Sequence, residues 1–235
     1  MDTLIEFGRG PLFRFAVALA VLGLIRLAVL SLWGMRQILR RAGDKRPLDL
    51  GAIIQRTFVN LNPVRYFRGN RGPYSVVSTL FHIGLILVPI FLAGHIRLWR
   101  RGVGIGWPAL PASLADALTI LTLVTGALLL VGRAWYVASR EMSRVQDWLL
   151  PLLIAFEFLS GYLLAHPASN PLDLQLVTFL HVGVGDLLLI VTPFTKIAHC
   201  ALLPFSQLVS EMAWRFVPGA GHEVVKTLGK EGQPI

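Results

Sequence analysis

The sequence contains few charged residues and a single cysteine. Charged side chains make up 15% of the 235 residues, whereas about 25% is usual in soluble domains. This shortage argues against an ordinary soluble enzyme. Cys200, the one cysteine, can form neither an intramolecular disulfide nor a cysteine-rich metal cluster. Any iron–sulfur cluster that works with this chain is therefore expected on a partner protein.

Acidic residues are also scarce, with 13 Asp and Glu against 22 Lys and Arg and a net charge of +9. A basic surplus can indicate nucleic-acid binding, but here the basic residues lie between long apolar blocks, where they set membrane topology. We therefore expect a lipid membrane as partner and no nucleic acid. No cleavable signal peptide is evident, because the first apolar block follows Asp2 and Glu6 and is long enough to span a bilayer.

Five apolar blocks are long enough to cross a bilayer, which takes roughly 20 residues of helix. They predict transmembrane helices at about 12–34, 76–98, 112–135, 147–165 and 173–203. Pro89 and Pro193 are expected to bend the second and the fifth of them. The predicted fold is an all-α integral membrane bundle of five helices, formed by residues 1–205, with a polar tail over residues 206–235.

Basic residues near the helix ends are shared unevenly between the two sides. Five lie on the side of the N-terminus and 16 on the other, nine of them in the loop between Arg36 and Arg71. The positive-inside rule then places the N-terminus outside and the C-terminus in the cytoplasm. We expect a multi-pass protein of the cytoplasmic (inner) membrane of a prokaryote.

The long first loop also has helical apolar spacing from Leu48 to Phe58, which predicts an amphipathic helix on the membrane surface. Two interpretations of its basic residues stay open. They bind anionic lipid, or they also contact a soluble partner.

Four of the six histidines fall inside predicted helices: His82 and His95 on the second, His181 and His199 on the fifth. Polar side chains in membrane helices are costly and usually functional, and neutral imidazole is a common axial ligand of haem iron. The 18 residues from His181 to His199 amount to five turns of a continuous helix, so both rings would leave one face. These residue types predict two b haems, each with two histidine ligands.

Depth in the membrane decides which histidines share a haem. The second helix runs outward and the fifth runs inward, so His82 pairs with His199 near the cytoplasm and His95 with His181 near the outside. The opposite pairing would put the two ligands of each iron at different depths.

Other residues near these histidines are candidates for cofactor contacts. Glycines let backbone approach a flat porphyrin closely, or serve helix–helix contact without any cofactor. Basic side chains at helix ends can pair with haem propionates, or extend to the interface as anchors. The candidates are Gly84, Gly94, Gly183, Arg97, Arg133 and Lys196.

Three further ionisable residues have no decided role. His166 lies where the fourth helix leaves the membrane, and it is a candidate proton acceptor for a quinol near the outer haem. Glu157 and Asp186 are deep acids that either pair with a basic residue such as Arg26 or relay protons.

The segment 81–84 (Phe-His-Ile-Gly), followed by Gly94-His95, resembles the second helix of the respiratory nitrate reductase gamma subunit. The segment from His181 to His199, which includes Pro-Phe-Thr-Lys-Ile-Ala at 193–198, resembles its last helix with the same 18-residue spacing. Related dihaem membrane cytochromes serve sulfate reducers and heterodisulfide-reductase-like complexes.

This resemblance implies a membrane cytochrome b subunit of a respiratory redox complex. Two bis-histidine b haems would pass electrons between a quinone, menaquinone or ubiquinone, and an iron–sulfur subunit, with the catalytic centre on another subunit. The 13 residues between His82 and His95 exceed the spacing in the nitrate reductase subunit, so nitrate is not assigned as terminal substrate. The alternative is a non-redox transporter or scaffold subunit, which would explain the buried acids but not four depth-matched histidines.

Overall fold

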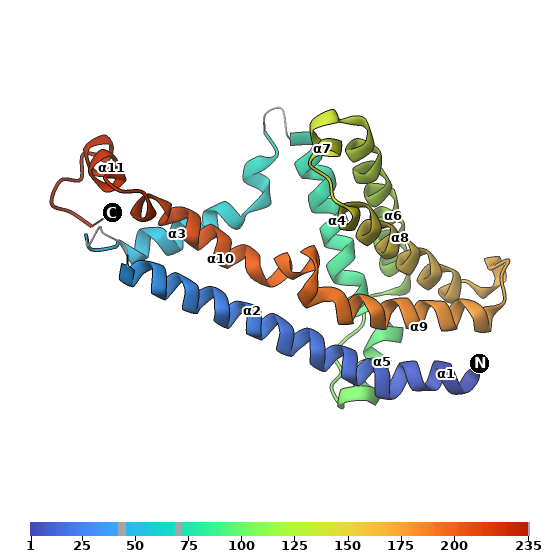
Figure 1. Cartoon of the computed structure of the whole chain (residues 1–235). Helices are drawn as coiled ribbons and strands as arrows, with labels where there is room; N and C mark the ends of the chain where they lie inside the picture. Colours follow the sequence, from blue (N-terminus) through green and yellow to red (C-terminus); the bar gives the residue numbers. More distant parts are fainter. Residues whose placement is uncertain (42–45, 69–71, 235) are drawn as a thin grey trace. The chain divides into compact units, whose positions relative to one another are not determined.

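The computed structural model describes residues 1–41, 46–68 and 72–234 (Figure 1). Lys45 and Arg71, two basic residues counted in the first loop, lie outside these ranges. The regular structure of the described residues is helical, and it contains no strand. Five helical segments are long and apolar enough to cross a membrane: Asp2–Arg41, Gly72–Phe91, Ala112–Trp135, Val145–Ala165 and Leu174–Phe194. The all-α fold with five candidate membrane spans is therefore confirmed.

The chain divides into two compact units, each described by itself. The first comprises residues 1–21 and 66–195, and the second comprises residues 22–65 and 196–235. Residue 205, the expected end of the bundle, lies inside helix α10 (His199–Glu211).

The first unit is a chain of packed helices. α4 (Gly72–Phe91) packs on α6 (Ala112–Trp135), α6 packs on α8 (Val145–Ala165), and α8 packs on α9 (Leu174–Val191) (Figure 1). The N-terminal helix α1 (Asp2–Phe7) and the π-helical turn η1 (Gly8–Leu12) pack on α9. η1 also contacts α5 (Ala93–Val103). The N-terminal segment therefore lies against both α5 and α9.

The contact between α4 and α6 depends on a missing side chain. A Cβ atom on Gly84 would overlap the Thr122 hydroxyl and lie 2.8 Å from the Leu118 carbonyl oxygen. Three buried threonines of α6 each donate their hydroxyl to the carbonyl four residues earlier, at 2.6–2.8 Å: Thr119, Thr122 and Thr125. α6 thus buries polar residues without leaving their hydroxyls unpaired.

The expected second helix, 76–98, is broken in two. α4 ends at Phe91, Leu92 is extended (φ −70°, ψ 131°), and α5 begins at Ala93. His82 and His95 are therefore on different helices, and a rotation counted along one continuous helix does not apply to them.

The expected fifth helix, 173–203, is also interrupted rather than bent. α9 ends at Val191 and is followed by the 3₁₀ turn η4 (Thr192–Phe194), extended Thr195 and a second 3₁₀ turn, η5 (Lys196–Ala198). α10 begins only at His199. Pro193 explains the interruption because it lacks an N–H and its ring clashes with the carbonyl of residue i−4. The argument that five continuous turns put His181 and His199 on one face is therefore wrong.

The remaining expected spans agree closely with the structure or prove too short. α6 has the expected bounds, and α8 begins two residues before the expected start. The first span was expected at 12–34, but the helix runs from Asp2 through η1 and α2 (Phe13–Arg41). The expected span is shorter because an apolar block in the sequence ends at charged residues. An α-helix continues through Arg and Lys at little cost.

The second unit contains the predicted amphipathic helix as α3 (Leu50–Leu61), which packs on α10. Asp49 caps it by accepting a hydrogen bond from the Ala52 N–H at 2.9 Å. Ile53 and Thr57 are buried, whereas Leu50, Ile54 and Phe58 are exposed. Residues after α10 form the turn η6 (Ala213–Phe216) and α11 (Ala220–Leu228), so much of the expected tail is helical.

Candidate haem-ligand site

His95 and His181 face one another within the first unit. Their ring planes differ by 11° and their ring centroids are 6.1 Å apart. An iron atom between two imidazoles, with metal–nitrogen bonds of about 2 Å on each side, separates the ring centroids by roughly 6 Å. The spacing of the two rings is therefore close to that of two axial ligands of one iron.

The break at Leu92 fixes the His95 ring. It frees three carbonyl groups at the end of α4, and each accepts a hydrogen bond. Pro89 O accepts from His95 Nδ1 at 3.1 Å, Ile90 O from Trp107 Nε1 at 2.8 Å, and Phe91 O from the Leu110 N–H at 3.0 Å. Backbone groups at such a break must find partners in a membrane, and here the candidate ligand is one of them.

A carbonyl oxygen only accepts, so the proton of His95 is on Nδ1 and the lone pair on Nε2 is the one available to a metal. The hydrogen bond to Pro89 O therefore holds His95 in the tautomer that a ligand through Nε2 requires.

His181 has a different set of neighbours, supplied by one turn of α8. Its Nδ1 lies 3.0 Å from Ser160 Oγ and 3.2 Å from Glu157 Oε1. The Ser160 hydroxyl also lies 3.1 Å from the Glu157 carbonyl oxygen, to which it donates. Ser160 and the carboxylate can then both accept the Nδ1 proton. This is the outer-shell pattern typical of metal-bound histidines, in which the second ring nitrogen donates to a carboxylate or neighbouring oxygen.

Two glycines make room for this arrangement. A Cβ atom on Gly161 would lie 3.0 Å from His181 Cε1, and one on Gly185 would lie 2.9 Å from Glu157 Oε1. The Ser160-Gly161 pair beside Glu157 was not among the residues predicted from the sequence. The sequence pattern that could have indicated this pair is a small polar residue followed by glycine, one helical turn after the acid Glu157.

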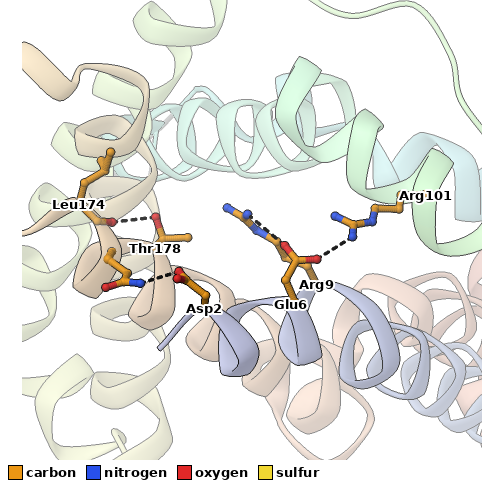
Figure 2. A network of polar contacts seen from close by, with 7 residues as sticks. Asp2, Glu6, Arg9, Arg101, Leu174 and Thr178 are labelled. Carbon is orange, nitrogen blue, oxygen red and sulfur yellow. Dashed lines mark hydrogen bonds and ion pairs between the residues drawn. The ribbon is translucent and has the colours of Figure 1, made fainter.

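The N-terminal segment connects the two helices that carry these rings (Figure 2). Glu6 on α1 pairs with Arg101 on α5 at 2.6 Å, and Asp2 accepts a hydrogen bond from Gln175 on α9. Arg9 lies 3.9 Å from Glu6 as well. These contacts join α1 to α5 and α9, the helices that carry His95 and His181.

Two acids of the same unit each have one buried oxygen atom. Glu157 Oε2 and Asp186 Oδ2 are buried and have no hydrogen-bond partner among the described residues. Asp186 lies close to η1, because a Cβ atom on Gly8 would be 3.6 Å from its Oδ2. Glu157 contacts an imidazole rather than a cation, and pairing of either acid with Arg26 stays a prediction, since Arg26 belongs to the second unit.

The other predicted pair, His82 and His199, is divided between the units. His82 Nδ1 donates to Ser78 O at 2.7 Å, and His199 Nδ1 donates to Lys196 O at 2.6 Å. Both rings therefore carry the Nδ1 proton, as a ligand through Nε2 requires. Their pairing stays a prediction.

The glycine candidates differ from one another. Gly84 serves the contact between α4 and α6, which is the helix-packing alternative. Gly94 and Gly183 are exposed; a Cβ atom on Gly183 would meet nothing within 4 Å, and one on Gly94 would lie 4.0 Å from the Arg97 guanidinium.

The three basic candidates have different surroundings. Arg133 donates to Ser143 Oγ at 2.8 Å, whereas Arg97 and Lys196 are exposed. Their pairing with propionates stays a prediction.

His166 uses both ring nitrogens within the chain. Nδ1 donates to Tyr162 O at 3.0 Å, and Nε2 lies 3.3 Å from Asp116 Oδ2. His222 is exposed, and its Nδ1 accepts from Arg46 at 3.0 Å.

Among the described residues, no three His, Cys, Asp or Glu side chains converge as they would around a zinc ion. His95 and His181 would hold the iron if a haem were bound, and the cofactor would supply one-electron chemistry.

The chain is similar to a protein of Nitratidesulfovibrio vulgaris (strain Hildenborough). The two are 31% identical over 204 residues, and this alignment covers 86% of this chain and 89% of the relative. The chain therefore belongs to the same family as that protein. No family model and no solved structure matches the chain.

Proposed function

We propose that this protein is the membrane cytochrome b subunit of a respiratory redox complex. The observation that carries the proposal is the geometry of His95 and His181, whose rings are nearly parallel with centroids 6.1 Å apart. The hydrogen bonds at Nδ1 of both rings support it, because they leave the metal-binding lone pair on Nε2.

In this proposal the chain holds two bis-histidine b haems, with His95 and His181 at one and His82 and His199 at the other. A quinol is oxidised near the outer haem and loses two electrons and two protons. The electrons pass one at a time to an iron–sulfur subunit on the cytoplasmic side. The histidines hold and orient the cofactors, and the apolar helices keep water away from them.

The topology belongs to the same proposal. The excess of basic residues in the first loop and at the C-terminal end favours an outside N-terminus and a cytoplasmic C-terminus in the inner membrane of a prokaryote. The likeness of both histidine segments to the nitrate reductase gamma subunit supports the quinone and iron–sulfur partners.

The absorbance spectrum of the purified protein tests this proposal. The expected result is a dithionite-reduced spectrum of b haem, with two haems per chain. A colourless protein, prepared from cells that load another b-type cytochrome correctly, contradicts it.

A second candidate function rests on the buried oxygens of Glu157 and Asp186, which have no hydrogen-bond partner among the described residues. Ionisable groups inside a membrane protein often line a path for protons or substrates. A transporter of this kind would contain no haem, so the same spectrum distinguishes the two functions.

A further inference from the structure

Helix α3 leaves one of its apolar faces uncovered. It packs on α10 within the second unit, and its residues Ile53 and Thr57 are buried (Figure 1). Leu50, Ile54 and Phe58 follow one another at intervals of four residues, which puts them along one side of the helix. These three residues are 59%, 51% and 69% exposed. Within the part of the chain that the structure describes, this apolar stripe therefore has no protein cover.

The place of α3 in the chain keeps it near a membrane surface. It lies between the first candidate span, which ends at Arg41, and the second, which begins at Gly72. Consecutive spans are joined on one side of the bilayer, so both of these ends meet the same surface. Residues 42–49 and 62–71 connect α3 to the two spans. Connections of that length reach about 30–40 Å at most, so α3 stays within reach of the lipid headgroups on that side.

The residues that flank α3 are mostly basic. Nine basic and two acidic residues lie from Arg36 to Arg71, and one of the acids, Asp49, caps α3. The described arginines at the end of α2 and after α3 are exposed: Arg36, Arg40, Arg41, Arg65 and Arg68. A basic amphipathic helix binds an anionic bilayer surface, because its apolar side chains leave water while its cations meet the headgroups.

The polar contacts of α3 lie on its other side. Asn60 Nδ2 donates to Glu211 Oε1 on α10 at 2.7 Å, and the Arg56 guanidinium lies 4.0 Å from Glu211 Oε2. At about 100° per residue, Arg56 is roughly 160° around the helix from Ile54, the middle residue of the apolar stripe. α3 therefore has a polar side joined to α10 and an apolar side without cover, which is the division that a helix between lipid and water requires.

We propose that α3 is an interfacial helix that inserts Leu50, Ile54 and Phe58 among the headgroups of an anionic bilayer. The inference rests on the membrane spans and the contacts of α3, and not on the proposed redox function. A lipid surface is favoured over a soluble protein because it already adjoins both ends of α3. Contact with it also removes the apolar stripe from water without a further partner.

Spin labels on α3 test this placement in the full-length protein. Cys200→Ser leaves no native thiol, and Ile54→Cys or Phe58→Cys then carries a nitroxide in nanodiscs of phosphatidylglycerol. EPR power saturation compares collisions with oxygen, which concentrates in the bilayer, with collisions with a water-soluble nickel chelate. The ratio of oxygen to nickel collisions is expected to be several-fold higher at both positions than in the control Val59→Cys.

Val59 is a matched control because it is an apolar residue of the same helix, 48% exposed against 51% for Ile54. It lies roughly 140° around the helix from Ile54, where it lines a groove together with Arg56 and Asn60. A label at this position is expected to collide mainly with the nickel chelate.

Nickel collisions at positions 54 and 58 as frequent as at position 59 overturn the proposal and point to a soluble partner for the apolar stripe. If one labelled variant does not assemble, Leu50→Cys reports on the same stripe. Nanodiscs of phosphatidylcholine test the lipid charge, because the ratio at position 54 is expected to fall in them, and an unchanged ratio contradicts the preference for anionic lipid. Since the measurement does not involve haem, a protein without haem overturns the proposed function and leaves this inference intact.

Discussion

The first unit contains two carboxyl–imidazole pairs that look alike in distance and differ in setting. Glu157 and His181 are 3.2 Å apart with side chains 19% and 16% exposed. Asp116 and His166 are 3.3 Å apart and about twice as exposed, at 36% and 33%. The two pairs differ more in which other groups contact each imidazole ring. His181 faces a second imidazole, whereas the Nε2 atom of His166 is the one that meets Asp116.

This comparison teaches that a histidine's second nitrogen decides its role more clearly than its carboxylate neighbour does. In His181 the carboxyl group lies at Nδ1, and the proposed function assigns Nε2 to the iron. In His166 the Nδ1 atom donates to the Tyr162 carbonyl, and Nε2 lies against the Asp116 carboxyl group. The Nε2 atom of His166 therefore has a protein neighbour in the place that a metal would take.

The most direct test of this comparison is to remove the His181 ring and the His166 ring in separate variants. His181→Ala is expected to reduce the haem content from two per chain to one, because the iron loses an axial ligand. His166→Ala is expected to keep both haems. Haem per protein, measured from the reduced pyridine spectrum, checks this. Equal haem content in the two variants would show that the ring facing His95 is no more a ligand than His166 is.

A smaller effect is expected from crowding the His181 ring without removing it. Gly161→Ala places a methyl group 3.0 Å from Cε1, so the ring must shift and outer-haem occupancy is expected to fall. Gly132→Ala is the matched control, since its added Cβ atom meets nothing within 4 Å. Haem occupancy after mild heating is the measurement, and an effect as large for Gly132→Ala as for Gly161→Ala contradicts the expectation.

The smallest effect is expected at the exposed pair. Asp116→Asn is expected to lower the free energy of unfolding by about 0.5 kcal/mol or less, as for other solvent-accessible ion pairs. The difference from wild type is expected to shrink further at high salt, because salt screens exposed charges. Thermal unfolding in detergent at low and high salt measures it. A larger loss that salt does not change would mean that the pair is more deeply buried than its exposure indicates.

Much of the fold could be predicted from the sequence because bilayer-spanning helices need long apolar blocks. All five spans were found, and the bounds of α6 were predicted to the residue. The helix breaks were not predicted. Pro89 and Pro193 indicated a disturbance, but hydropathy does not show whether a chain bends at a proline or ends its helix and starts another.

Only some residues of the candidate site could be chosen from the sequence, and the reason is physical. Histidines are rare enough in membrane helices that His95 and His181 could be selected by residue type alone. Ser160 and Gly161 could not, because small residues are common at membrane helix contacts and carry no signal of their own. Their role follows from the packing of α8 against α9, which brings them to the His181 ring.

The threonines of α6 bear on how substitutions in related sequences are interpreted. The hydroxyl groups of Thr119, Thr122 and Thr125 donate hydrogen bonds to carbonyl groups of their own helix. An exchange to valine at these positions would therefore keep the shape of the side chain and leave the contacts between helices in place. Substitutions at Ser160, whose hydroxyl reaches a histidine of another helix, would instead remove a contact between α8 and α9.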